Sequence, residues 1–562
     1  METGPPVPAE PSGPLGRDEL RRRVTRGTAL LTARSALILV LGLGSNIALA
    51  WMLTPREFGV IALGAALVLL GSGLAEGGLG ASLIRREAEP TAGELAAVNG
   101  VQIALTVAIA LLTLAVAAPF GGDGLAVAAM VATLPVTVLR TPSVIVLERQ
   151  LQYRTIATVD LVEAVAFYAV ALGCVAAGLG VWGVVIAFAV RAVAGTGTMV
   201  RLGPLGLVAP RWSWVEVRPL VGFGARMQSV SVAAAARHQL LNLLIALLAG
   251  VSALGVWSLA WRILQVPYSV FATVGRVAFP TLSRVAAAGG DARPILERGV
   301  AMLALANGVV LVAIAGFAPA LPALVGSAWS DVPETLLWAS LALTLNAPVW
   351  VLTTSWFFAA GDAGTVLRAL LLHTVVWFGI ALPLLDSVGV PVIALAWLAA
   401  GVVSGVYLAR RTFASTGARV GRSLAPPAAA TAAGIGAGWA IAVATEPDVL
   451  RGVLGAAAGE ALLLLGVAIL RPALLRDTRA LVTEAAGRMG AAGESPLPAD
   501  PTGRTGERTA DAGERPPAAD PAGRTGEPPP ADPAGYGGEP GPAGEPSGRG
   551  GDRTPPADPA SG

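Results

Sequence analysis

The stretch that decides the fold spans residues 220–286 and reads LVGFGARMQSVSVAAAARHQLLNLLIALLAGVSALGVWSLAWRILQVPYSVFATVGRVAFPTLSRVA. It holds two apolar segments, roughly 220–249 and 252–284, each long enough to cross a bilayer as a helix. A cationic side chain at the centre of a bilayer costs a few kcal/mol. We therefore predict two membrane helices whose arginines face away from lipid. The polar and cationic residues among their aliphatic neighbours are Arg226, Arg237, His238, Gln239, Asn242 and Arg262.

Arg226 and Arg237 lie eleven positions apart, which at about 100° per residue puts them on one face of a helix. Two interpretations stay open for this face. Its guanidinium groups extend along the helix toward the lipid headgroups, or they line a water-filled cavity inside the protein. Arg226 lies near a helix end and suits either interpretation, whereas Arg237 lies near the middle and favours the cavity.

The composition extends this interpretation to the whole chain. Of its 562 residues, 54% are hydrophobic and 14% charged, and the mean hydropathy is +0.67. Apolar runs of about 18 or more residues predict membrane helices. We predict fourteen spans, at Thr28–Leu53, Phe58–Glu76, Leu95–Ala118, Leu125–Leu139, Ile156–Ala177, Val181–Val200, Leu220–Ala249, Ser252–Ser283, Leu296–Phe317, Glu334–Ala359, Val366–Leu385, Val390–Ala409, Leu424–Thr445 and Leu450–Leu470.

The arginines predict the orientation, because positively charged connections stay on the cytoplasmic side of a membrane. Twenty-five arginines lie before the first predicted span, after the last one as far as Arg488, or in every second connection and its immediate margins. The alternate connections hold only Arg56 and Arg451. With fourteen spans, both termini are then cytoplasmic. We predict a multi-pass protein of the cell (cytoplasmic) membrane.

The connections and the two ends of the chain differ in character. The outward connections are very short, as at 178–180 and 250–251, so we expect no domain outside the membrane. Two inward connections, 148–154 and 212–218, mix aromatic, apolar and arginine residues, which suits short helices in the membrane interface; solvated loops are the alternative. Residues 1–27 and 490–562 are polar and rich in Pro and Gly, and we expect both segments to be disordered.

Several kinds of chemistry lack the residues that they require. The chain contains no lysine, which a phosphate-binding P-loop needs. One cysteine, Cys174, and two histidines cannot supply an ordinary His/Cys metal site. Paired carboxylates for hydrolysis and a Ser/His/Asp set are also missing. We therefore expect no enzyme, no catalytic residue, no metal and no cofactor. Buried arginines instead suit an anionic substrate such as a phosphate, which they bind through charge-assisted hydrogen bonds.

Four of the other polar residues inside predicted spans have specific expected roles or partners. Asp160 and Glu163 are three positions apart on one helix face, and we expect them to pair with arginine in a structural role. His373 suits an interhelical hydrogen bond better than a proton relay. Glu460 lies in the fourteenth span, and it and a substrate anion are the two candidate counter-charges for the arginines at mid-membrane.

Several motifs resemble those of one family of membrane proteins. Residues 53–59 (LTPREFG) and 77–84 (GGLGASLI) are similar to the first helical hairpin of bacterial polysaccharide flippases. These are the Wzx-like oligosaccharide flippases of the multidrug/oligosaccharidyl-lipid/polysaccharide exporter superfamily. The likeness covers about residues 25–480 and is strongest before about residue 290. It continues in 147–154, 178–183, 254–267 and 277–283.

The resemblance implies an all-α, polytopic membrane protein with about 14 transmembrane helices, in two six-helix lobes plus two C-terminal helices. It implies that a lipid-linked, undecaprenyl-pyrophosphate-type oligosaccharide moves from the inner to the outer leaflet by alternating access. The expected partners are this anionic substrate, membrane lipid, a polysaccharide polymerase and glycosyltransferases, and no nucleic acid. The implied parts are a disordered N-terminus (1–27), an N-terminal lobe (28–201), a linker (202–219), a C-terminal lobe (220–411), helices 13 and 14 (423–470) and a disordered tail (490–562).

The arginines nearest the predicted midplane are the expected substrate contacts. We assign Arg237, Arg262 and Arg191 to the pyrophosphate or an anionic sugar, and Arg34 and Arg226 to the inward mouth. Family members often carry an Asp-Asn pair and a later arginine in the seventh span, but residues 241–248 here read LNLLIALL, which puts ion coupling through that span in doubt. A lipid II-type or small-molecule exporter of the same superfamily stays open as an alternative. A membrane glycosyl-polymerase or ligase is the alternative from another class, although those enzymes usually carry a large outward loop.

Overall fold

The computed structural model describes residue 34, residues 37–444 and residues 448–479. The segments 1–27 and 490–562, predicted to be disordered, lie outside these described residues, and for 221–236 only the backbone is described. The chain divides into two compact units, residues 1–493 and 494–562. All the helices below belong to the first unit.

The described residues form helices without strands. Short 3₁₀ turns at 118–120, 318–320 and 327–329 connect some of them. The α-helices are Leu37–Met52, α2 (Pro55–Glu76), α3 (Leu79–Arg85), α4 (Ala92–Ala117), α5 (Gly121–Val131), α6 (Leu134–Val138), α7 (Thr141–Arg149), α8 (Tyr153–Ala176), α9 (Val181–Leu202), α10 (Trp214–Leu248), α11 (Gly250–Ala287), α12 (Arg293–Phe317), α13 (Leu321–Val325), α14 (Asp331–Ala359), α15 (Ala363–Val388), α16 (Pro391–Thr416), α17 (Val420–Val443) and α18 (Val449–Leu470).

The chain is an all-α, polytopic membrane protein. Ten segments of the described chain are long and apolar enough to cross a membrane. One of them, Ala92–Val138, has 47 residues and contains α4, α5 and α6, where two crossings are predicted. The described parts of the predicted spans are helical, except that Leu125–Leu139 is divided between α5 and α6 by a turn at residues 132–133. The number of crossings and the boundaries of the lobes stay predictions.

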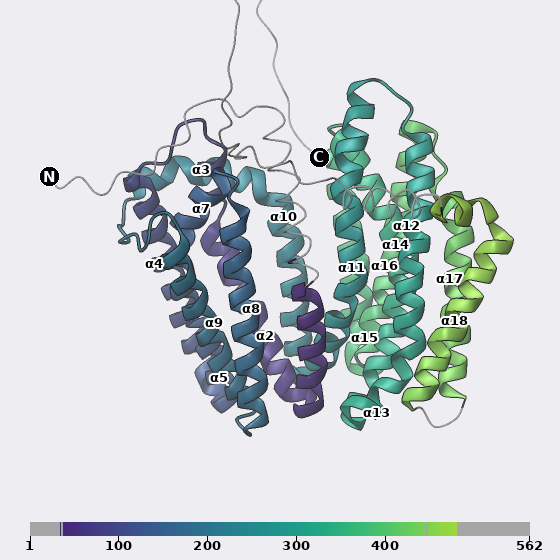
Figure 1. The fold of residues 1–562 in the computed structure, drawn as a ribbon, viewed down its shortest axis with the longest axis horizontal. Coiled ribbons are helices and arrows are strands. Elements are labelled where there is room, and N and C mark those ends of the chain that lie inside the picture. Colours follow the sequence, from purple (N-terminus) through teal and green to yellow (C-terminus); the bar gives the residue numbers. More distant parts are fainter. Residues whose placement is uncertain (1–33, 35–36, 445–447, 480–562) are drawn as a thin grey trace, which may run out of the picture. The chain divides into compact units, whose positions relative to one another are not determined.

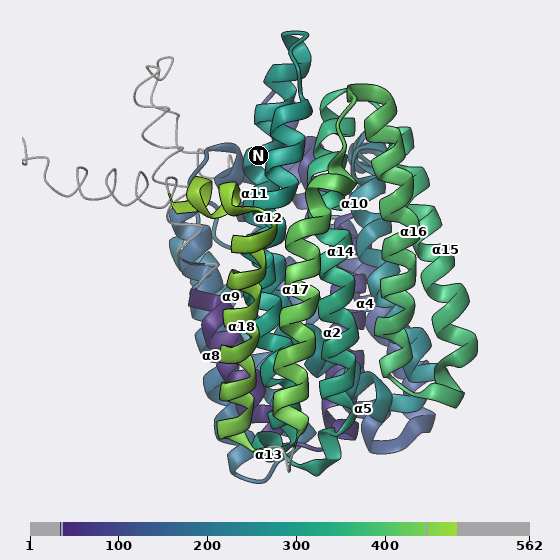
Figure 2. The ribbon, with the colours of Figure 1, turned by 90° about the vertical axis from the view of Figure 1, so that its right-hand side faces the viewer.

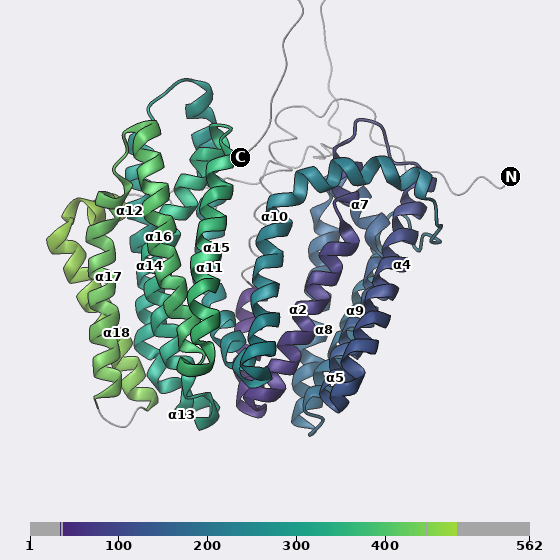
Figure 3. The same ribbon diagram turned by 180° about the vertical axis from the view of Figure 1, so that it is seen from behind.

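Of the two connections in which we predicted short interfacial helices, 148–154 contains none, whereas 212–218 runs into the first turns of α10. In 148–154 the chain turns, because α7 ends at Arg149, Leu151 takes a positive φ of 56°, and α8 begins at Tyr153. In 212–218 the helical part belongs to α10, which begins at Trp214 and not at Leu220. Pro219 lies inside α10 and removes one backbone hydrogen bond, which permits a bend. Figure 3 shows α10 changing from a course across one end of the bundle to a course alongside α2.

The helices fall into two packed groups joined by α10. Most helices before α10 pack mainly on one another, as α8 does on α9 and α4 on α5, and α2 also packs closely on α11; we call residues 37–202 the amino-terminal bundle. Helices α11 to α18 do the same, and we call residues 250–470 the carboxy-terminal bundle. Helix α10 packs on α2, α3 and α4 in the first bundle and on α11 and α15 in the second. Figures 1 and 2 show these groups from two directions.

The two bundles meet most closely where α2 crosses α11. A Cβ atom at Gly59 would overlap the carbonyl oxygen of Val251, and one at Gly255 would overlap that of Pro55. Glycine is therefore required at both positions, because only a residue without a side chain lets two backbones approach so closely. Beside this crossing, Trp329 Nε1 donates a hydrogen bond of 3.0 Å to the carbonyl of Ala50. The bundles are closed against each other at this end, which we call the crossing end.

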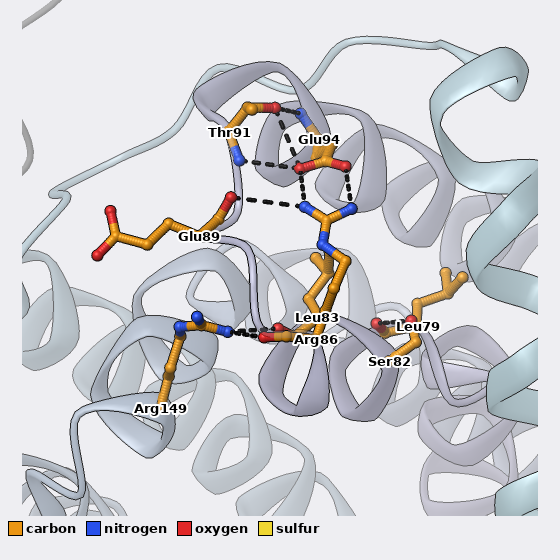
Figure 4. A network of polar contacts seen from close by, with 8 residues as sticks. All are labelled: Leu79, Ser82, Leu83, Arg86, Glu89, Thr91, Glu94 and Arg149. Atoms are coloured by element: carbon orange, nitrogen blue, oxygen red, sulfur yellow. Dashed lines mark hydrogen bonds and ion pairs between the residues drawn. The ribbon is translucent and has the colours of Figure 1, made fainter. Parts of the chain in front are cut away.

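The opposite end carries α3, α7 and the beginning of α10, and we call it the arginine-rich end (Figure 1). There the guanidinium of Arg86 forms two hydrogen bonds of 2.7 Å with the carboxylate of Glu94 (Figure 4). This pairing raises the pKa of Arg86 above its ordinary value. Arg149 donates to the carbonyls of Arg86 and Glu87 at 2.5 and 2.7 Å. These bonds fix the α3–α4 connection to α7, so this end of the amino-terminal bundle is internally braced.

Candidate functional site

A polar pocket of about 350 Å³ lies between the bundles, with walls from Leu37–Met52, α2, α8, α10 and α11. We call it the central pocket. No carboxylate is among its lining residues, and amides, aromatic rings and one arginine supply its polar atoms. Such a mixture of apolar walls with a few convergent polar groups is typical of a ligand site. The polar lining residues are Asn46, Tyr168, His238, Gln239, Asn242, Ser258, Trp261, Arg262 and Gln265.

Arg262 supplies the cationic group of the central pocket. Its Nη1 donates a hydrogen bond of 2.6 Å to Oδ1 of Asn46, in the opposite bundle. Its guanidinium carbon lies 5.2 Å from the ring centroid of Phe58, also in the opposite bundle. No carboxylate of the described residues pairs with it. Since the protein does not neutralise this charge, an anion that enters the pocket is attracted to it.

Two amides on α10 face the same pocket. Asn242 Nδ2 donates a hydrogen bond of 3.1 Å to Oε1 of Gln239. The carbonyl oxygen of the Asn242 side chain is buried without a hydrogen-bond partner. A buried polar atom left unpaired is costly. A ligand hydroxyl group would satisfy it, so the α10 wall of the pocket suits a hydroxyl-rich molecule.

An aromatic cluster that was not predicted from the sequence lies behind the central pocket. Neighbouring rings have centroids 5.1–6.5 Å apart. The imidazole of His238 packs on one of them, with its centroid 4.1 Å from that of Trp261. The spacing of Trp257, Trp261 and Tyr268 along one helix face was the signal in the sequence, but the partner rings come from α15 and α16. The cluster comprises Trp257, Trp261, Tyr268, Trp377 and Trp397.

Arg237 lies at a second pocket, of about 420 Å³, which we call the lateral pocket. Its guanidinium carbon is 5.6 Å from the ring centroid of Trp377, and its Nε atom is buried without a hydrogen-bond partner. Ala66 and Gln239 line both pockets, so the two are adjacent. The lateral pocket is lined by Leu63, Ala66, Leu67, Leu70, Arg237, Gln239, Leu240, Leu243, Thr374 and Phe378.

A third cavity, of about 720 Å³, lies within the amino-terminal bundle and has a different character. Its arginines are neutralised by acids: Arg34 pairs with Asp160, and Glu163 pairs with Arg140 and, at 3.5 Å, with Arg191. The expected pairing of both carboxylates with arginine is therefore confirmed. Glu163 is only 4% exposed, so these ion pairs join α8 to α9 and to the α6–α7 connection deep inside the bundle.

The five arginines expected to bind substrate are distributed over these sites. Arg262 lies in the central pocket and Arg237 in the adjacent lateral pocket. Arg34 and Arg191 line the amino-terminal cavity, where acids already hold them. The side chain of Arg226 lies outside the described residues. We predicted that Arg191, Arg237 and Arg262 act together because they lie at similar predicted depths in the membrane. Depth alone does not specify the bundle in which a side chain lies.

Two other polar residues have clear environments. His373 Nδ1 lies 3.1 Å from Oγ of Ser404, which confirms the expected hydrogen bond between helices, here α15 and α16. Glu460 is on α18, which packs on α12 and α17, and it forms no ion pair with a described arginine. In this structure it is therefore not the counter-charge of Arg237 or Arg262. The described residues hold no group of three or more His, Cys, Asp or Glu side chains that could bind a metal ion.

Comparison with known proteins agrees with this architecture. The family model for polysaccharide biosynthesis proteins matches residues 48–334. A lipid II flippase, MurJ, in an inward closed conformation has a TM-score of 0.61 at 12% identity, over 80% of this chain and 100% of that chain. A multidrug resistance MATE family transporter of the MOP superfamily, facing inward, has a TM-score of 0.49 at 15% identity, over 67% and 94% of the two chains. No curated protein matches the chain.

Proposed function

The chain belongs to the polysaccharide biosynthesis protein family, and from this premise we propose that it is a flippase or exporter for a lipid-linked oligosaccharide. The substrate class is an undecaprenyl-pyrophosphate-type glycan, moved from the inner to the outer leaflet of the cytoplasmic membrane. Family membership supports a role in polysaccharide synthesis. The many membrane helices, in a fold shared with a solved lipid II flippase, support transport across a membrane. The proposal assigns no catalytic residue, and it keeps both termini in the cytoplasm.

One observation carries the choice of substrate: an arginine without an acid partner lies in a pocket of amides and indoles. A guanidinium binds the oxygens of a phosphate through two parallel hydrogen bonds. Asn242 and Gln239 can bond to sugar hydroxyls, and the indole of Trp261 offers an apolar face against which a sugar ring can pack. The pocket therefore combines the groups that a phosphate-linked sugar requires.

The same arginine suggests how binding is coupled to movement. Arg262 contacts Asn46 and Phe58 across the boundary between the bundles. A pyrophosphate that takes over the guanidinium removes these contacts and so weakens one tie between the bundles. Opening of the crossing end then requires that α2 separates from α11. We propose alternating access by rocking of the two bundles around a midplane site, and this arrangement supports the proposal.

We still propose Arg34, Arg191 and Arg226 as substrate contacts, but as contacts that form after that of Arg262 or that bind the substrate more weakly. A substrate anion can reach Arg34 only by displacing Asp160, and Arg191 only by displacing Glu163. We therefore rank Arg262 first among the proposed substrate contacts, and Arg237 second. The proposed inward mouth remains at the arginine-rich end.

The test is transport of a fluorescent undecaprenyl-pyrophosphate disaccharide in proteoliposomes, read by quenching from one side. We expect Arg262→Ala to abolish transport at normal protein abundance, and Arg262→Lys to retain part of it, because an ammonium lacks the planar pair of donors. Arg276→Ala is the matched control, since Arg276 lies on the same helix, outside the central pocket, and bonds to Thr273 of its own helix. Transport by Arg262→Ala at the rate of the control would refute the proposed site.

A further inference from the structure

The lateral pocket differs from the central pocket in the chemistry of its walls. Helices α2, α10 and α15 supply Leu63, Leu67, Leu240, Leu243 and Phe378. Helix α10 packs on both α2 and α15, and Figure 3 shows it between them. Leu240 is 48% exposed although it lines the pocket, so the pocket is open at the protein surface and not enclosed. An apolar cleft that opens on the surface of a membrane protein is accessible to hydrocarbon chains.

A cationic group lies at this otherwise apolar site. The guanidinium of Arg237 lies over the ring of Trp377, and no described carboxylate pairs with it. Its buried Nε atom lacks a hydrogen-bond acceptor. An unpaired cation in apolar surroundings is costly unless an anion completes the site. A hydrocarbon chain that ends in a phosphate supplies both an apolar group for the walls and an anion for Arg237.

The lateral pocket is also continuous with the central pocket. Ala66 and Gln239 belong to the walls of both, and Arg237, His238 and Gln239 are consecutive residues of α10. Consecutive residues on a helix point about 100° apart, so α10 presents Arg237 to one pocket and His238 to the other. One molecule with an apolar chain and a polar head can therefore lie across both pockets at Gln239.

We propose that the lateral pocket binds the apolar chain of a prenyl diphosphate, with the phosphates held by Arg262 and Arg237 where the two pockets adjoin and the attached sugar in the central pocket. This inference rests on the proposed function and adds to it the path of the lipid. The carboxy-terminal pair α17 and α18 is the other place where a chain could lie, because Leu464 and Leu465 are exposed there. The lateral pocket is favoured because it joins an apolar wall, an unpaired cation and the polar pocket.

The test uses a farnesyl diphosphate analogue with a photoreactive benzophenone at the end of its chain, and the full protein in nanodiscs. We expect crosslinks in 63–70, 240–243 and 374–378, and protection by excess unlabelled farnesyl diphosphate. Leu240→Trp fills the mouth of the pocket and should weaken farnesyl diphosphate binding by about tenfold. Binding of inorganic pyrophosphate should stay unchanged, because that ligand has no chain.

Leu247→Trp is the matched control, since Leu247 is exposed on the same face of α10, two turns further on, and lines none of the pockets described. Leu67→Trp, from the α2 wall, repeats the test independently of α10. Crosslinks confined to 420–470, or equal farnesyl affinity in Leu240→Trp and Leu247→Trp, would overturn the lateral site but leave the proposed function intact. Failure of Arg262→Ala to affect transport would count against the proposed function, whatever the crosslinks show.

Discussion

Arg262 and Asn46 are 216 positions apart in the chain, yet Nη1 of the arginine donates a 2.6 Å hydrogen bond to the side-chain oxygen of the asparagine. The bond joins α11 to the helix Leu37–Met52, and therefore joins the carboxy-terminal bundle to the amino-terminal bundle. Asn46 also donates a hydrogen bond of 2.6 Å to the carbonyl of Gly42. It is thus held in place to accept from Arg262.

Asn46→Asp should raise the stability of the protein and lower its transport rate. The new carboxylate neutralises Arg262, so we expect a stronger tie between the bundles and a higher unfolding temperature. The same ion pair competes with a substrate anion, so transport should fall by about tenfold or more. Asn46→Ala is the comparison, because it removes the acceptor without adding a charge and should retain more transport than Asn46→Asp. Normal transport by Asn46→Asp would mean that Arg262 does not bind the anion.

Gly59→Ala should destabilise the protein at the crossing of α2 and α11. The added Cβ overlaps the carbonyl oxygen of Val251, and the resulting strain should cost about 1–3 kcal/mol of the free energy of unfolding. Gly73→Ala, on the same helix, meets nothing within 4 Å and should be neutral or slightly stabilising. Thermal unfolding in detergent measures both. Equal unfolding temperatures for the two variants would show that the bundles do not meet at Gly59.

Glu163→Gln should be among the most destabilising single changes in the amino-terminal bundle. It leaves Arg140 and Arg191 facing each other without their shared carboxylate, and breaking a buried ion pair costs about 3–5 kcal/mol. A second change, Arg191→Gln, should recover part of this loss. If Arg191→Gln alone abolishes transport and leaves stability normal, Arg191 binds substrate, as first expected, and is not a structural residue.

Glu148→Gln should stabilise the protein in a pH-dependent way. Burial, and then the negative charge of Glu76, raise the pKa of Glu148 above its ordinary value of 4.5. The ionised carboxylate is therefore disfavoured by folding, so the wild type loses stability as the pH rises from the ordinary pKa through the raised one. The variant should unfold at a higher temperature than the wild type at neutral pH, and the difference should shrink as the pH falls below 4.5. The exposed Glu87 provides the control, Glu87→Gln; a difference that does not vary with pH would refute the assignment.

The helices could be predicted from the sequence, because an apolar run of membrane length has few other ways to satisfy its backbone. The pairing of carboxylates with arginines could also be predicted. Asp160 and Glu163 lie on one helix face, and a buried carboxylate needs a cation nearby. The pairing of His373 across helices followed from a similar argument, since one polar group on an apolar helix must find a partner.

The composition of the site could not be predicted in the same way. Nothing in the residues around Asn46 indicates that it meets Arg262, because the contact depends on how two bundles pack. The aromatic cluster has the same origin, because its five rings come from α11, α15 and α16, and the spacing of Trp257, Trp261 and Tyr268 on α11 does not indicate which rings of other helices meet them. Hydropathy fixes how deep a residue lies, but the partner across a helix interface is fixed by the shapes of both surfaces.

The indoles of Trp257, Trp261, Trp377 and Trp397 have neighbouring centroids 5.6–6.5 Å apart. At such separations, light energy absorbed by one ring passes readily to the next, so the four rings emit as a group. The cation over Trp377 belongs to Arg237, and a change in its position alters the emission of the whole group. In a chain with one cysteine and no lysine for attaching dyes, the protein thus contains its own optical reporter of events at the pockets.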